Sequence, residues 1–193
     1  MQKAKLTKRF ISFIMAFVLV IMLIPAGITT VGAAGDESKF LAPIEAPIAG
    51  SIPISTAAQL AAIGNDSDSL SKNYHLANDI DLSGSEWLPI GTSSLPFTGT
   101  FDGQGYVIKN LTITGDHRYA GLFGYTTEAM IKNVGLEGTN IDISSTSSDV
   151  YAGGICCESI GSNSSISNCY NTGDVSAATT SSSYSVVVPC GGK

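Results

Sequence analysis

The apolar positions of this chain fall into three patterns. Residues 10–24 form an almost unbroken apolar run. Residues 55–64 are rich in alanine and place Leu60 and Ile63 on one face at helical spacing. From Phe97 onward, apolar residues come in short β-prone pieces separated by glycines and polar turns. This order predicts an N-terminal apolar segment, one short helix and then an all-β region.

The first 34 residues have the three parts of a secretory signal peptide. The apolar run ends at Pro25, and the small residues Ala33 and Ala34 follow just before a polar stretch. A basic head comes first and consists of Lys3, Lys5, Lys8 and Arg9. We therefore predict cleavage after Ala33 or Ala34 and export from the cytoplasm. The rival interpretation is an uncleaved anchor, but the apolar run is shorter than the roughly 20 residues that cross a bilayer.

The segments after the signal peptide differ in character. Residues 35–53 contain three prolines, which favours an extended linker. Residues 54–96 are expected to cap the β region, with a helix near 56–63 that Thr56 or Ser55 begins and Gly64 ends. Strand fragments are predicted at 74–77 and 80–82.

Three copies of the pattern Ile-x-Asn-apolar occur in the β region, with asparagines at Asn110, Asn133 and Asn168. The first two copies are 22–23 residues apart, and the third follows after 33–35 because of a polar insert at 144–149. Glycine-bearing strands repeated at this period predict a solenoid whose coils pair edge to edge. We expect Ile108, Ile131 and Ile166 to stack in one column, with the three asparagines in another. A clamp at a corner is the favoured role for these asparagines, and ligand binding is the alternative.

These repeats resemble a known family. Residues 120–125 (AGLFGY), followed by 131–136 (IKNVGL), resemble the GLUG motif of bacterial surface proteins, and residues 152–156 with 166–175 resemble a second copy. The motif residues are Gly121, Leu122, Phe123 and Gly124. The resemblance covers about residues 55–175. It implies a right-handed parallel β-helix over 97–185 in large bacterial cell-surface or secreted proteins, without enzymatic activity of the repeats themselves.

Two features depart from this pattern. Cys157 stands where the closing glycine of the motif would be. Residues 186–193 do not continue into a third glycine-rich copy, so we expect an aberrant tail and interpret the chain as the N-terminal part of a longer protein, shortened by a frameshift or a premature stop. No sorting signal or second apolar segment follows, so no stable membrane anchor is expected after cleavage.

The net charge of the chain excludes one class of binding partner. Four of the ten basic residues and none of the sixteen acidic ones lie in residues 1–34, so the remaining chain has six basic and sixteen acidic side chains and a net charge of −10. An acidic surface repels phosphate backbones, which makes nucleic acid an unsuitable partner.

The cysteines could be buried thiols, or a disulfide could join Cys156 or Cys157 to Cys169, and the sequence leaves both open. The fourth cysteine is Cys190.

Few residues suggest chemistry. The two histidines, His75 and His117, are not in a zinc-peptidase motif, so we predict no catalytic residue, no metal and no cofactor. Asp79 and Asp81 could form an acid pair, although strand alternation explains them as outward-facing residues around a buried Ile80. Three tyrosines could form a binding stripe for an extracellular ligand, a carbohydrate or a host protein: Tyr119, Tyr151 and Tyr170.

Together these features predict a secreted or cell-surface scaffold with a structural or adhesive role. The alternative is a carbohydrate-active β-helix, which would be either a polysaccharide lyase or glycoside hydrolase, or a carbohydrate-binding module.

Overall fold

The chain divides into two compact units, residues 1–34 and 35–193. The computed structural model describes residues 44–146, 149–179 and 185–188, all of which belong to the second unit. The predicted signal peptide with its cleavage site at Ala33 or Ala34 lies outside the described residues, as do residues 35–43 of the linker and 189–193 of the tail.

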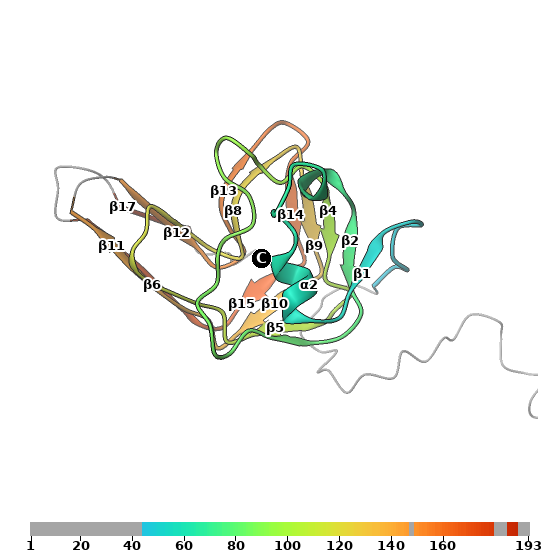
Figure 1. Cartoon of the computed structure of the whole chain (residues 1–193), viewed down its shortest axis with the longest axis horizontal. Coiled ribbons are helices and arrows are strands. Elements are labelled where there is room, and N and C mark those ends of the chain that lie inside the picture. Colours follow the sequence, from blue (N-terminus) through green and yellow to red (C-terminus); the bar gives the residue numbers. More distant parts are fainter. Residues whose placement is uncertain (1–43, 147–148, 180–184, 189–193) are drawn as a thin grey trace, which may run out of the picture. The chain divides into compact units, whose positions relative to one another are not determined.

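The described residues form a β-solenoid of about three coils, and every strand pairing among them is parallel. This confirms the predicted parallel β-helix. Successive coils add one strand each to five sheets, in the orders β1-β2-β4-β9-β14, β3-β5-β10-β15, β6-β11-β16, β7-β12-β17 and β8-β13 (Figure 1). The strands are β1 (Ile52–Ile54), β2 (Tyr74–Leu76), β3 (Ile80–Asp81), β4 (Thr100–Asp102), β5 (Val107–Lys109), β6 (Thr112–Asp116), β7 (Tyr119–Ala120), β8 (Phe123–Thr127), β9 (Met130–Lys132), β10 (Gly135–Glu137), β11 (Asn140–Ser145), β12 (Val150–Gly153), β13 (Cys156–Ile160), β14 (Ser165–Ser167), β15 (Tyr170–Asn171), β16 (Asp174–Thr179) and β17 (Ser185–Val188).

The register of the coils corrects the predicted columns. Ile108 pairs with Ile80 below and Leu136 above, at steps of 28 residues. Ile131 instead pairs with Phe101 and Ile166, at steps of 30 and 35 residues. The expected column of Ile108 over Ile131 is therefore wrong, and so is the step of 22–23 residues between the first two units.

The physical reason is that two corners of each coil have the same local requirement. Each corner needs a buried aliphatic residue and then a residue with a left-handed backbone, a conformation that asparagine tolerates. Asn110 has φ 60° at the corner after β5, whereas Asn133 and Asn168 have φ 56° and 51° at the corner after β9 and β14. The repeated pattern therefore recurs within one coil as well as between coils.

Two of the sheets form an extension of the solenoid. In each of the later coils the chain runs outward along one strand and returns along the next, as in β6 and β7, β11 and β12, and β16 and β17. We call these two facing layers the arm, and they extend to the left in Figure 1. Its interior is aliphatic, with Ile113, Ile141, Ile143 and Val150 all at most 1% exposed. Ser144 and Ser145, the first residues of the predicted insert at 144–149, lengthen β11, while residues 147–148 lie outside the described residues.

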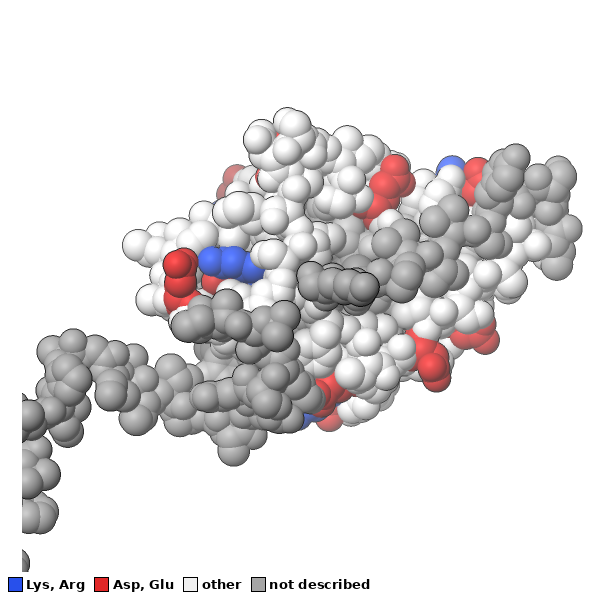
Figure 2. All heavy atoms as spheres, turned by 180° about the vertical axis from the view of Figure 1, so that it is seen from behind, with Lys and Arg blue, Asp and Glu red and all other residues white. Residues whose placement is uncertain are grey.

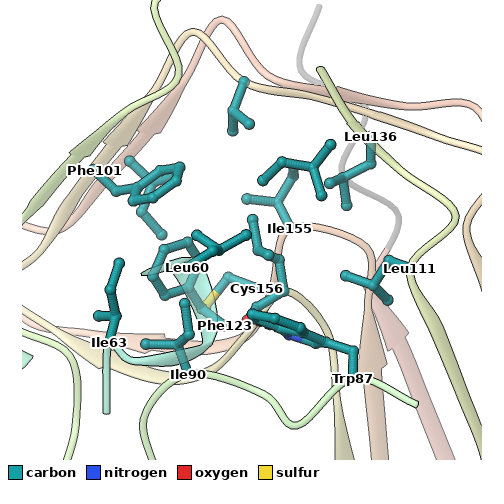
Figure 3. Packing of buried hydrophobic residues seen from close by; sticks show 14 of the residues in the cluster. Leu60, Ile63, Trp87, Ile90, Phe101, Leu111, Phe123, Leu136, Ile155 and Cys156 are labelled. Atoms are coloured by element: carbon teal, nitrogen blue, oxygen red, sulfur yellow. Dashed lines mark hydrogen bonds between the residues drawn. The ribbon is translucent and has the colours of Figure 1, made fainter. Parts of the chain in front are cut away.

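The N-terminal end of the stack is capped as predicted. Helix α2 (Ala57–Ala61) begins at Thr56, whose hydroxyl accepts a hydrogen bond from the Gln59 amide at 3.2 Å, and the 3-10 turn η2 (Ser69–Ser71) follows it. Leu60 is fully buried and Ile63 is 3% exposed, so the helix lays its apolar face over the core (Figure 3). Trp87 is 5% exposed and its indole N–H donates to the Leu122 carbonyl at 3.1 Å. Trp87 thus packs the cap against a neighbouring coil.

Several predicted boundaries shift by a few residues. Ile52 and Pro53, assigned to the linker, form β1 with Ile54 and pair with β2. The segment 74–81, assigned to the cap, already forms β2 and β3, which pair with strands of the next coil. Val186 to Val188, assigned to the aberrant tail, belong to β17 and pair with β12. The strands at 74–76 and 80–81 were predicted from the local pattern, but their membership of the solenoid depends on pairing with the next coil.

Candidate functional site

The acid pair that sequence analysis considered for catalysis holds two coils together. The Asp79 carboxylate accepts a hydrogen bond from the Val107 amide at 3.0 Å and lies 2.8 Å from Lys109 Nζ. The Asp81 carboxylate accepts from the Ser83 amide and from Asn110 Nδ2, both at 2.9 Å. Both acids are exposed, while Ile80 between them is buried, as predicted.

The same role recurs at the opposite corner, in a group that we call the corner ladder: Asp102, Asn133 and Asn168. Asp102 is 1% exposed, and its Oδ1 accepts from the Gln104 amide and from Asn133 Nδ2, both at 3.0 Å. Lys132 Nζ lies 3.3 Å from Asp102 Oδ2. Asn168 Nδ2 then donates to Asn133 Oδ1 at 2.7 Å. Asn133 and Asn168 thus clamp a corner through their amides, while Asn110 performs a similar task at the other corner with Asp81.

Two further acids bind the next coil and were missed by sequence reasoning. Glu86 accepts bonds from the amide and hydroxyl of Thr114. Glu128, with φ 52°, accepts from the Ser162 and Asn163 amides at 3.1 and 3.0 Å. The partners lie 28 to 35 residues away, so no local signal reveals them.

The GLUG glycines allow close approach of neighbouring coils. A Cβ on Gly124 would lie 2.7 Å from the Gly91 carbonyl oxygen, and one on Gly121 would lie 2.6 Å from the Gly153 carbonyl oxygen. Leu122 and Phe123 of the motif are fully buried in the core. In the motif, the two glycines therefore let the backbones of neighbouring coils pack closely, and the two residues between them fill the core.

Cys157 takes the place of Gly124 one coil later, as the sequence indicated, because Cys156 pairs with Phe123 and Glu158 with Tyr125. Its thiol donates to the Tyr151 carbonyl at 3.3 Å, and burial raises the pKa of the Cys157 thiol to about 12. No disulfide joins Cys156, Cys157 and Cys169 to one another. Cys190 lies outside the described residues.

The candidate binding residues are on the outer side of β7, β8, β12 and β13. Tyr119 and Tyr151 lie opposite each other in adjacent coils, and their rings stack with centroids 5.4 Å apart and planes 14° apart. The Arg118 guanidinium carbon lies 5.2 Å from the Tyr119 ring centroid. We call this group, together with Tyr125 and Glu158, the aromatic corner.

The neighbouring groups also affect the ionisation of the tyrosines in the aromatic corner. Desolvation raises the pKa of the Tyr119 hydroxyl, the charge of Arg118 opposes this rise, and the charge of Glu158 adds to it. Desolvation also raises the pKa of the Tyr125 hydroxyl, and Glu158 adds to the rise through its charge and a hydrogen bond. The group combines two stacked rings with a guanidinium and a carboxylate. These are groups that bind polar ligands through ring contacts and hydrogen bonds.

The predicted tyrosine stripe forms only in part. Tyr170 is at a different corner, where its hydroxyl donates to Glu137 Oε1 at 3.2 Å and its ring covers Gly135. Tyr119 and Tyr151 share a column because they hold the same position in β7 and β12, whereas Tyr170 is in β15.

Other chemistry finds little support in the described part of the chain. There, no group of three or more His, Cys, Asp and Glu side chains gathers closely enough to hold a metal ion. His75 Nδ1 is hydrogen-bonded to the Ser51 hydroxyl at 2.7 Å. Acidic side chains on the face shown in Figure 2 lie in small separate groups among neutral ones. Among the described residues no helix is long and apolar enough to cross a membrane.

Comparison with known proteins agrees with this architecture. The family model described as "The GLUG motif" matches residues 148–176. A protein of Evansella cellulosilytica named "Putative Gly-rich membrane protein" is 35% identical over 145 residues, which cover 70% of this chain and 16% of that protein. "Halomucin" of Haloquadratum walsbyi is 39% identical over 97 residues, which cover 47% of this chain and 1% of that protein.

The chain therefore spans less than a fifth of the length of either relative. No solved structure matches it significantly. The segment that the family model matches pairs in parallel with the coil that buries Leu122 and Phe123. The family match and the strand register therefore describe the same repeat. The chain carries the GLUG motif at residues 148–176 within the coil architecture of a parallel β-solenoid.

Proposed function

We propose that this chain is an exported structural or adhesive unit of a bacterial surface repeat protein, without catalytic activity of its own. The relatives' names, a Gly-rich membrane protein and a halomucin, support a place at the cell surface. The export signal predicted in residues 1–34 supports the same location.

One observation carries the proposal: the acids that a glycosidase or lyase would use are already engaged in joining coils. Asp79, Asp81 and Asp102 each bind a donor in the following coil. A catalytic acid must change its protonation state during turnover, and a carboxylate whose oxygens already accept hydrogen bonds from the next coil is poorly suited to do so. The arrangement of these acids suits a rigid stack of coils.

The test has two parts. The full chain is expressed with its N-terminal segment in a secreting bacterial host, and the N-terminus of the product is read by mass spectrometry. We expect the first residue to follow Ala33 or Ala34. The purified protein is then incubated with a panel of neutral and acidic polysaccharides, and new reducing ends and unsaturated products are measured. We expect neither. Cleavage that is abolished by Asp79→Asn, in a variant that still folds, would contradict the proposal.

A second candidate function is carbohydrate binding at the aromatic corner. The specific observation is the stacked pair of half-buried tyrosines beside a guanidinium and a carboxylate. A pyranose offers an apolar C–H face to aromatic rings and hydroxyls to charged groups.

This candidate is tested by affinity electrophoresis in gels that contain neutral polysaccharides. Retardation of the native chain should disappear in Tyr151→Ala and persist in Tyr170→Ala, since Tyr170 lies outside the corner. Equal mobility with and without each polysaccharide would contradict carbohydrate binding, while the scaffold proposal would stand.

A further inference from the structure

Arg118 differs from the other basic residues that the structure describes. The lysines in the described ranges each form an ion pair with an aspartate: Lys72 with Asp68 at 3.2 Å, Lys109 with Asp79 at 2.8 Å and Lys132 with Asp102 at 3.3 Å. Arg118 is exposed and forms no ion pair with any described residue. Its positive charge is therefore not neutralised by a neighbouring carboxylate within the described part of the chain.

The aromatic corner holds this guanidinium close to one position. Its central carbon lies 5.2 Å from the centroid of the Tyr119 ring, and that ring also stacks on Tyr151 with centroids 5.4 Å apart. A guanidinium attracted to a ring face loses less freedom when it binds a ligand than one on a freely moving side chain. Arg118 is therefore partly ordered for binding in advance.

The acids of the corner belong to the coil after the one that carries Arg118. Glu158 in β13 pairs with Tyr125 in β8. Asp149, just before β12, has its Oδ2 3.5 Å from the Tyr151 hydroxyl. A guanidinium can only donate hydrogen bonds, and an ionised carboxylate can only accept them. The surface therefore fits a ligand with an acceptor for the first coil and donors for the second.

We propose that Arg118 makes the aromatic corner selective for glycans that carry an isolated carboxylate, as a uronate residue among neutral sugars does. This inference rests on carbohydrate binding at the aromatic corner, the second candidate function above. The uronate carboxylate accepts from the Arg118 guanidinium, the sugar hydroxyls donate to Glu158 and Asp149, and the C–H face of the ring contacts a tyrosine.

Two features of the chain limit the class of ligand. An acidic peptide would supply the carboxylate but few hydroxyl donors for the two acids, so a sugar fits better. A glycan with a carboxylate on every residue is disfavoured, because residues 35–193 have six basic and sixteen acidic side chains and a net charge of −10. A single carboxylate flanked by neutral sugars avoids most of this repulsion.

The experiment titrates the isotope-labelled full chain with a trisaccharide in which a terminal glucuronate is joined to neutral xylose residues, and with its galacturonate counterpart. The methyl ester of each probe keeps the sugar rings and removes the charge. Dissociation constants are obtained from NMR chemical-shift changes. We expect at least one probe to bind about fivefold more tightly as the carboxylate than as the ester, the range of an exposed ion pair. The Arg118 Nε–H signal should shift further with that carboxylate than with its ester.

Arg118→Gln should remove the difference between carboxylate and ester. The matched control is Lys72→Gln, which takes the same charge from an exposed ion pair outside the corner and should keep the difference. Tyr151→Ala should weaken binding of both forms, because it removes a ring that both contact. The comparison of carboxylate with ester in the native chain needs no variant to fold.

The outcomes separate this inference from the function on which it rests. Equal binding of carboxylate and ester by the native chain would overturn the inference and leave carbohydrate binding in place. A preference that persists in Arg118→Gln, or disappears equally in Lys72→Gln, would also overturn it. If neither the probes, their esters nor the neutral xylose trisaccharide bind, carbohydrate binding at the corner fails and this inference fails with it.

Discussion

Asn168 donates its side-chain amide to the side-chain oxygen of Asn133, one coil below, across 2.7 Å. Asn133 in turn donates to the buried Asp102, so a series of side-chain hydrogen bonds runs through three successive coils at one corner. A carboxylate buried to this extent needs donors to offset its desolvation. The corner ladder therefore contributes to stability through its middle member most of all.

We expect Asn133→Gly to lower the free energy of unfolding by about 1–3 kcal/mol, because it removes two hydrogen bonds and leaves a buried acceptor short of a donor. Glycine keeps the left-handed backbone, so the loss reports on the amide. The measurement is urea unfolding followed by circular dichroism. Asn110→Gly is the matched control at the exposed corner, where the loss should stay within about 0.5 kcal/mol. Equal losses in the two variants would contradict the ladder's importance.

Glu128 should hold the turn of the next coil in place. Its two carboxylate oxygens accept from the Ser162 and Asn163 amides. Glu128→Gln leaves one acceptor in place of two, and we expect a loss of about 1 kcal/mol together with faster amide hydrogen exchange at residues 162 and 163. Asp142→Asn, at an exposed position of β11, controls for the loss of a negative charge and should leave that exchange unchanged.

Gly124 and Cys157 hold equivalent positions in consecutive coils but have different room for a Cβ. We expect Gly124→Ala to destabilise the fold by about 1–3 kcal/mol, because the new Cβ would lie 2.7 Å from the Gly91 carbonyl oxygen. Cys157→Ala keeps a Cβ at a position that already accommodates one. The thermal midpoint of this variant should therefore fall by less than that of Gly124→Ala. A larger loss in Cys157→Ala than in Gly124→Ala would refute the packing argument.

The coil-joining acids should make stability depend on pH in the acid range. Hydrogen bonds from Asn110 and Ser83 lower the pKa of Asp81, and hydrogen bonds from Thr114 lower the pKa of Glu86. A carboxyl group whose pKa is lowered on folding stabilises the fold above its unfolded pKa, and this contribution is lost as pH falls through the folded pKa.

We therefore expect a thermal midpoint that is level near neutral pH and falls below about pH 4.5, where the unfolded carboxyls begin to bind protons. The double variant Asp81→Asn, Glu86→Gln should show a shallower fall, measured by circular dichroism melts at several pH values. An equally steep fall in the double variant would mean that other carboxyls control acid stability.

The thiol of Cys157 should resist alkylation in the folded protein. Its pKa of about 12 leaves very little thiolate at pH 8, and only 6% of the residue is exposed. Iodoacetamide labelling followed by peptide mass spectrometry should find Cys157 unmodified in buffer and fully modified in urea. Rapid labelling of Cys157 in buffer would show that this part of β13 opens readily.

Several tertiary features could not be read from the chain. The burial of Asp102, the link between Glu128 and residues 162–163, and the separation of Tyr170 from Tyr119 and Tyr151 all depend on which residues face each other between coils. The coils differ in length because the arm differs in length, so the step between facing residues varies from 28 to 35 in the pairs described above. A repeat period that fits one pair of neighbouring coils therefore does not fit the next pair.

What the sequence determined by itself was the class of fold: short apolar pieces between glycine turns, capped by an amphipathic helix, predict a solenoid because strand and helix periods are local properties of the chain. The inward positions Ile80, Ile108 and Ile131 followed from the same alternation. Only the tertiary structure decided the register. Asn110 and Asn133 satisfy the same local rule at two corners, and the backbone hydrogen bonds between coils alone assign each to its column.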